Sequence, residues 1–190
     1  RVYGDTLVYG NARVYGNALV YDNARVYGNA KVGGNAKVGG NALVGDDARV
    51  SGNTRVYGNA KVSGNARVFD DALVGDNAWV YGNAWVKGNA LVKGNARVYG
   101  NAKVGDNAVV GDDVEIFDNA GVYSNARVGD NAWVKGNALV SGNARVYGNA
   151  KVSGHADICS SGDIITIDNI GSRIDTTTAF RTINGSIDIT

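Results

Sequence analysis

The chain has 190 residues with 19 basic and 18 acidic side chains, and its net charge of +1 gives no general attraction to nucleic acids or anionic membranes. One Cys and one His exclude an intrachain disulfide framework and any metal centre that needs several Cys or His ligands. Apolar residues make up 44% of the chain, but only three are Phe and three are Trp, so a core must be built from small side chains.

A six-residue repeat fills most of the sequence. An aliphatic residue returns at every sixth position from Val2 to Ile158, which makes 27 consecutive hexads with no insertion or deletion. Four residues after each aliphatic from Val2 to Val152 stands a small residue, which is Ala everywhere except at Thr6, Thr54 and Val114. The unit is Val-x-Gly-Asn-Ala-x, and such self-similarity is typical of solenoids.

Each unit has the chemistry of a short strand followed by a tight corner. A period of six fits neither an α-helix nor a coiled coil. In x-Val-x the Val side chain points to one side and its neighbours to the other, while Gly-Asn favours the positive φ of a corner. Three units give a triangular coil of 18 residues. The 27 units therefore predict an all-β, three-sided parallel β-helix of about nine coils, roughly 43 Å long at about 4.8 Å per coil.

Residues 1–158 resemble the hexapeptide-repeat left-handed parallel β-helix, whose signature is an aliphatic residue, two or three turn residues and then a small residue. The resemblance implies a left-handed solenoid, whereas the spacing alone predicts only a three-sided one. Acyltransferases of this fold typically act as trimers with a His general base near a loop that interrupts the coils. The γ-class carbonic anhydrases share the fold but need three His around zinc, which this chain lacks.

Residues 159–190 lack the hexad and are rich in Ile, Thr, Ser and Asp. Alternating segments at 163–167 and 186–189 predict short strands around Gly171 and an Asn184-Gly185 hairpin turn. Because a solenoid end exposes unpaired backbone groups, we interpret residues 159–190 as a short β-rich C-terminal cap or a truncated module. The run 170–180 is similar to a small C-terminal module of phage- and prophage-encoded repeat proteins of unassigned activity.

Residues 18 apart should form columns on the surface of such a solenoid. One column forms a basic row, with Arg13, Lys31, Arg49, Arg67, Trp85 and Lys103 in order. A basic row can follow phosphates. However, the 17 Lys and Arg of the solenoid divide 6, 5 and 6 among the three faces, so nucleic acid is not favoured as a partner.

Aromatic residues provide a second candidate surface. The largest predicted patch spans four consecutive coils of one face and contains Trp79, Tyr81, Arg97, Tyr99, Phe117 and Trp133. Exposed patches of this kind mark interfaces, here with a second copy of the chain or with a carbohydrate. The alternative is that the rings only stabilise the β-ladder along which they stack.

Little in the sequence points to catalysis or cofactor binding. His155 is the only candidate catalytic residue, and it occupies a corner position otherwise held by Asn or Asp, which makes a structural substitute the favoured interpretation. Cys159 adds one further potential ligand, too few for a metal centre. Acidic pairs such as Asp46-Asp47 fall on different corners, so we interpret them as turn formers rather than calcium ligands. No cofactor site is predicted.

A duplication also argues against a finely placed site. Residues 84–108 and 132–156 match at 21 of 25 positions with an offset of 48 residues, or eight hexads. Because eight is not a multiple of three, the two copies lie on different faces, which a scaffold tolerates and a catalytic cleft does not.

The sequence thus favours a structural or assembly scaffold, such as a spacer, stalk or fibre-like solenoid of phage or bacterial origin. We expect self-association, side by side or end to end, through a face or the open end of the helix. The alternatives are an acyltransferase-like enzyme that uses His155 and a carbohydrate-binding solenoid. Neither a signal peptide nor a membrane span is evident, which leaves a cytoplasmic or virion-associated location as the expectation.

Overall fold

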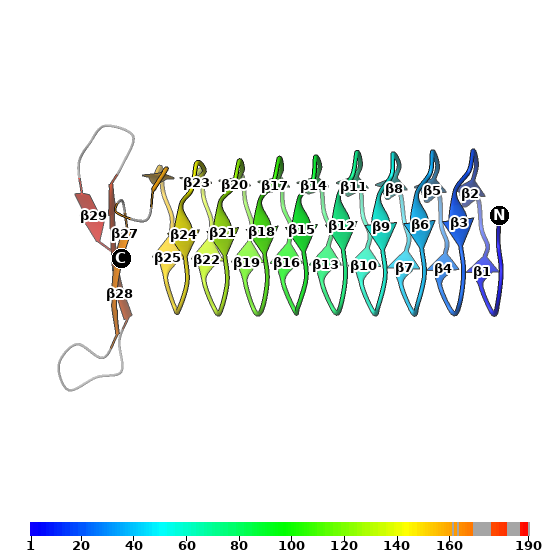
Figure 1. The fold of residues 1–190 in the computed structure, drawn as a ribbon, viewed down its shortest axis with the longest axis horizontal. Coiled ribbons are helices and arrows are strands. Elements are labelled where there is room, and N and C mark those ends of the chain that lie inside the picture. The colour runs from blue at the N-terminus through cyan, green and yellow to red at the C-terminus, as the bar shows by residue number, and fades with distance from the viewer. Residues whose placement is uncertain (161, 163, 169–175, 182–186, 190) are drawn as a thin grey trace.

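The computed structural model describes residues 1–160, 162, 164–168, 176–181 and 187–189. Two-residue strands follow one another every six residues, and the coils stack one behind the other along a straight axis (Figure 1). The strands form three parallel sheets, one for each side of the coil. The three-sided parallel β-helix predicted from the hexads is therefore confirmed.

Each sheet collects every third strand. Sheet I has nine strands: β1 (Leu7–Val8), β4 (Arg25–Val26), β7 (Leu43–Val44), β10 (Lys61–Val62), β13 (Trp79–Val80), β16 (Arg97–Val98), β19 (Glu115–Ile116), β22 (Trp133–Val134) and β25 (Lys151–Val152). Sheet II also has nine: β2 (Arg13–Val14), β5 (Lys31–Val32), β8 (Arg49–Val50), β11 (Arg67–Val68), β14 (Trp85–Val86), β17 (Lys103–Val104), β20 (Gly121–Val122), β23 (Leu139–Val140) and β26 (Asp157–Ile158). Sheet III has eight: β3 (Leu19–Val20), β6 (Lys37–Val38), β9 (Arg55–Val56), β12 (Leu73–Val74), β15 (Leu91–Val92), β18 (Val109–Val110), β21 (Arg127–Val128) and β24 (Arg145–Val146).

Strand pairing repeats with the predicted period of 18 residues. Val80, for example, pairs with Val62 on one side and Val98 on the other. The 26 strands of the three sheets, at three per coil, complete between eight and nine turns. The first hexad contributes an isolated bridge between Val2 and Val20 rather than a strand, so the count is close to the nine coils expected.

One continuous core runs along the axis and is made of the repeated aliphatic and small residues. From Ala18 to Ile158 the Val, Ile and Ala of these two positions are at most 2% exposed. The first coil is different, since Val2 is 47% and Val8 is 38% exposed. No coil could bury these side chains alone, because each layer is covered only by its two neighbours.

The corners hold the coils together through backbone and side-chain hydrogen bonds. The corner residue with positive φ is usually Gly, and at the other corners it is Asp or Ser124. Every such Asp accepts, through Oδ2, the backbone N–H of the residue 18 positions later, as Asp118 does from Gly136 at 3.1 Å. The following Asn residues form ladders, in which Asn83 Nδ2 donates to Asn101 Oδ1 at 3.1 Å. The structure thus shows the corner aspartates acting in turns, as the sequence predicted.

The C-terminal segment forms an antiparallel sheet of β27 (Ile164–Asp168), β28 (Thr176–Arg181) and β29 (Ile187–Ile189). Strand β28 packs against β25 and β26 at the end of the solenoid. There the buried Thr178 Oγ1 accepts the backbone N–H of Lys151 at 3.0 Å. The predicted turns at Gly171 and Asn184-Gly185, and most of the run 170–180, lie outside the described residues. No helix in the described part of the chain is long and apolar enough to span a bilayer.

Candidate aromatic interface

The predicted aromatic residues meet on sheet I as one continuous row of rings in contact. We call this row the aromatic ladder; its rings belong to Trp79, Tyr81, Tyr99, Phe117 and Trp133. Successive ring centroids are 5.0, 4.8, 5.0 and 6.2 Å apart. The middle rings lie nearly parallel, at 5° and 4°, whereas the Phe117–Trp133 contact is edge-on at 74°. These separations are within the range in which aromatic pairs attract one another.

Two adjacent columns of the sheet build the ladder. Tyr81, Tyr99 and Phe117 each follow the buried residue of their strand and therefore stack directly, coil upon coil. Trp79 and Trp133 instead precede the buried residue of their strands, and they lie in the column that also contains Arg97 and Glu115. The ladder thus crosses from the first column to the second and back, with a Trp at either end.

The two Trp rings keep an open side. Trp79 is 37% and Trp133 is 39% exposed, whereas the three rings between them are half-buried. The ammonium of Lys61 lies 5.2 Å from the Trp79 ring centroid, and that of Lys151 lies 5.7 Å from the Trp133 ring. A lysine of the neighbouring coil therefore bounds the ladder at each end by a cation–π contact.

An ion pair marks the middle of the patch. Arg97 Nη1 lies 3.4 Å from Glu115 Oε1, and the Tyr99 hydroxyl donates to Glu115 Oε2 at 3.0 Å. The pKa of Tyr99 is raised well above its ordinary value of 10.0, first because burial disfavours the phenolate. The hydrogen bond to Glu115 and the negative charge of that carboxylate act in the same direction. Tyr99 is thereby held protonated as the donor that orients Glu115.

This coupling predicts a pH-dependent contribution to stability. Because the pKa of Tyr99 is higher in the folded than in the unfolded chain, its contribution is complete below about pH 10 and is lost as the pH rises through the folded-state value. We expect the free energy of unfolding of Tyr99→Phe to fall less steeply above pH 10 than that of the unmodified protein. Urea unfolding at a series of alkaline pH values measures this difference. Parallel curves for the two proteins would contradict the coupling.

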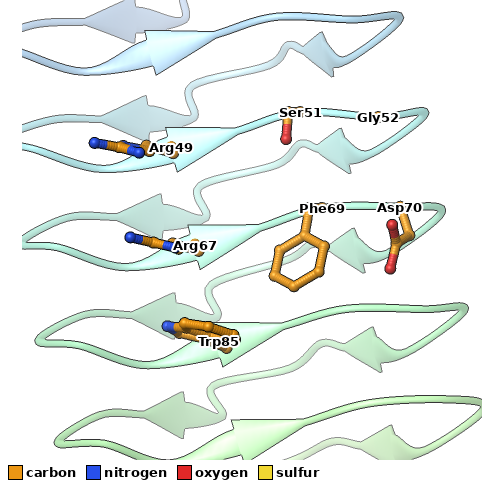
Figure 2. A pocket seen from close by; sticks show the side chains of 7 residues that line it. All are labelled: Arg49, Ser51, Gly52, Arg67, Phe69, Asp70 and Trp85. Carbon is orange, nitrogen blue, oxygen red and sulfur yellow. The ribbon is translucent and has the colours of Figure 1, made fainter.

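The basic row on sheet II forms a second surface cluster (Figure 2). Arg49, Arg67 and Trp85 occupy register positions on the paired strands β8, β11 and β14, as the 18-residue columns predicted. Trp85 lies between two cations, with the Arg67 guanidinium carbon 5.1 Å and the Lys103 ammonium 5.7 Å from its ring centroid. The small Ser51 and Gly52 leave an open hollow of about 340 Å³ beside these side chains. This shallow hollow lacks the deep enclosure typical of small-molecule sites.

His155, the only candidate catalytic residue, lies at an exposed corner next to the end of the solenoid. Its Nε2 lies 3.4 Å from Asn137 Nδ2, so it takes the place of an Asn in the corner ladder. Asn137, Leu139, Ala156 and Asp157 surround a hollow of about 150 Å³ beside it. The thiol of Cys159 contacts Asp157 Oδ1 at 3.3 Å and is exposed. Among the described residues, no group of three or more His, Cys, Asp or Glu is placed to hold a metal ion.

The patch predicted from the sequence did not include three charged residues that the structure places in it. Lys61, Glu115 and Lys151 complete the column of Trp79, Arg97 and Trp133, but they belong to no aromatic motif. Extending the 18-residue column by one coil in each direction would have found the two lysines. Glu115 stands between Arg97 and Trp133 in the same column.

These observations define the protein as a β-solenoid of hexapeptide repeats. The family model of the YdcK β-solenoid repeat matches five segments of the chain. Three of them overlap, at residues 7–22, 12–28 and 18–34, and two are separate, at residues 60–76 and 138–154. No curated protein matches the sequence.

The solved structures that match this chain include two UDP-N-acetylglucosamine acyltransferases. UDP-N-acetylglucosamine acyltransferase of Francisella novicida is 16% identical, with a TM-score of 0.49, over 80% of this chain and 66% of that enzyme. UDP-N-acetylglucosamine O-acyltransferase of Moraxella catarrhalis is 15% identical, with a TM-score of 0.49, over 80% of this chain and 71% of that enzyme. This chain therefore spans about two thirds of the length of those enzymes, and a likeness of this degree carries no statement about activity.

Proposed function

We propose that the protein is a structural scaffold, a rigid spacer that associates with a second copy of itself through the aromatic ladder. The unbroken core supports the first half of this proposal. Every coil of the solenoid is hydrogen-bonded to its neighbours through three sheets and by side chains at the corners. A rod with one continuous core and no interrupting loop resists bending, which is the property that a spacer or stalk needs.

The aromatic ladder is the observation that carries the second half. Its Trp and Tyr side chains are of the types enriched at protein interfaces. The two Trp rings are more than a third exposed, and their neighbours in the same column are the charged residues Lys61, Arg97, Glu115 and Lys151. A face that holds five rings in contact and an internal ion pair is suited to a partner that is flat and partly apolar. Another sheet of the same kind has both properties.

Replacing both Trp residues with Lys tests this proposal. We expect Trp79→Lys/Trp133→Lys to remain folded and to sediment as a monomer at concentrations where the unmodified chain associates, because two charges then replace the exposed apolar ends of the ladder. Sedimentation velocity over a concentration series measures the association. Tyr57→Lys/Tyr147→Lys is the matched control. These two rings are 37% and 43% exposed, and they lie on a different face of the rod, next to the sheet III strands β9 and β24. The control should associate normally.

Three results would overturn the proposal. If the unmodified chain stays monomeric at every concentration, the chain does not self-associate. If the double Trp variant associates as strongly as the unmodified chain does, the aromatic ladder is not the contact surface. A glycan that binds the unmodified chain and not the double Trp variant, with no change in sedimentation, would assign the ladder to carbohydrate binding instead.

A further inference from the structure

The column that precedes the buried residues of sheet I has a nearly symmetric order of side chains. Six consecutive coils, from β10 to β25, carry Lys61, Trp79, Arg97, Glu115, Trp133 and Lys151 at equal spacing. From either end the order is Lys, Trp and then a charged residue. The two central residues carry opposite charges. Such an order is self-complementary about its midpoint, which lies between β16 and β19.

We infer that two copies pair face to face and antiparallel, about a two-fold axis that runs along the strands between β16 and β19. This inference rests on the proposed self-association and gives it a geometry. A two-fold axis in this direction reverses the axis of the solenoid but leaves each column facing the same column of the other copy. Since the coils are evenly stacked along a straight axis (Figure 1), all six positions stay in register.

The central pair gives the arrangement its specificity. Arg97 faces Glu115 of the partner subunit, and Glu115 faces Arg97 of the partner subunit, so two ion pairs form across the interface beside the two within the chains. Trp79 faces Trp133 of the partner subunit on one side, and Trp133 faces Trp79 of the partner subunit on the other. Lys61 faces Lys151 of the partner subunit at the rim of the interface. Within its own chain Lys61 lies over Trp79 and Lys151 lies over Trp133, and solvent screens the repulsion between the facing ammonium groups.

The neighbouring column fits the same axis. Tyr99 faces Phe117 of the partner subunit, which continues the ring contacts of the ladder across the interface. Tyr81 faces Lys135 of the partner subunit, where an ammonium can lie against a ring. A parallel pair, by contrast, would set each column against the other column. Glu115 would then face Phe117 of the partner subunit, an apolar ring that cannot pair with its carboxylate.

Charge exchange at the centre tests this geometry. We expect Arg97→Glu and Glu115→Arg each to weaken self-association by about tenfold or more, because both variants place like charges opposite one another at two positions. The double exchange Arg97→Glu/Glu115→Arg restores opposite charges both within and between the chains and should restore self-association. Thermal unfolding of each variant confirms that it is folded. If the single variants dissociate and the double exchange does not recover, the antiparallel pairing is wrong.

Cross-linking separates the two orientations directly. Lys61→Cys and Lys151→Cys, each made together with Cys159→Ser, supply one thiol per chain at opposite ends of the column. In the antiparallel pair, a short bis-maleimide should join the two variants to each other when they are mixed and should join neither to itself. Cross-linking of each variant to itself would show parallel packing and overturn the inference. The self-association would survive that result, whereas monomeric sedimentation of the unmodified chain would overturn the proposed function.

Discussion

Replacing Gly94 with Ala is expected to lower the free energy of unfolding by about 2–4 kcal/mol, from left-handed backbone strain and overpacking together. Gly94 is a corner residue with a φ of 67°, which is unfavourable for an L side chain. A Cβ at this position would also lie 2.6 Å from the backbone nitrogen of Asp112 and 2.9 Å from its Cα, in the next coil. The substitution therefore strains one corner and pushes two coils apart.

A second glycine of the same column separates these two causes. Gly148 has a nearly equal φ of 69°, but a Cβ there would meet no heavy atom of the described residues within 4 Å. Gly148→Ala should therefore show only the backbone cost, about 1–2 kcal/mol, in chemical denaturation. Gly94→Asp should lose less stability than Gly94→Ala, because the corner aspartates accept a hydrogen bond from the next coil, as Asp76 does from Gly94 at 3.1 Å. Equal losses for Gly94→Ala and Gly148→Ala would contradict the role of coil spacing.

The period of the repeat was enough to predict the fold, because a uniform unit leaves few ways to bury its Val and Ala. The same period also predicted which surface residues are neighbours, so Tyr81, Tyr99 and Phe117 could be assigned to one face. The register of the strands confirms this assignment. The members of a column depend only on the path of the backbone. Once the number of residues per coil is known, they can be read from the sequence.

Contacts between side chains depend on rotamers and could not be predicted in this way. The hydrogen bond from Tyr99 to Glu115 spans 16 residues and joins the two columns, which no periodicity indicates. The packing of side chains against glycines outside the corners could not be predicted from the period either. Gly33 and Gly75 follow the buried residue of their strands, and their missing side chains make room for the rings of Tyr15 and Tyr57 from neighbouring coils. The symmetric order around Arg97 and Glu115 was visible in the sequence only after the columns had been extended to the flanking lysines.

The hexad also allows the scaffold to be separated from its proposed interface. Deleting residues 82–87 removes one complete unit and joins Tyr81 to Gly88, so the repeat continues without a break. Arg97 then follows Trp79 by 12 residues instead of 18, which moves every later residue to a different face. We expect the shortened chain to fold, because Val and Ala still fill the core. Its aromatic ladder, however, is divided between two faces, so self-association should be lost.

Deleting residues 34–39 is the matched control. It also removes one hexad with one core Val and one core Ala, and it joins Gly33 to Gly40 in an unbroken repeat. All coils from Lys61 to Lys151 keep their relative register, so this variant should associate like the unmodified chain while its thermal stability matches that of the other deletion. Circular dichroism and sedimentation velocity on the two variants measure both properties. Loss of association in both would place the contact elsewhere, whereas association in both would show that it needs no continuous ladder. Only a loss confined to the deletion of residues 82–87 ties assembly to the side chains that sheet I holds in register.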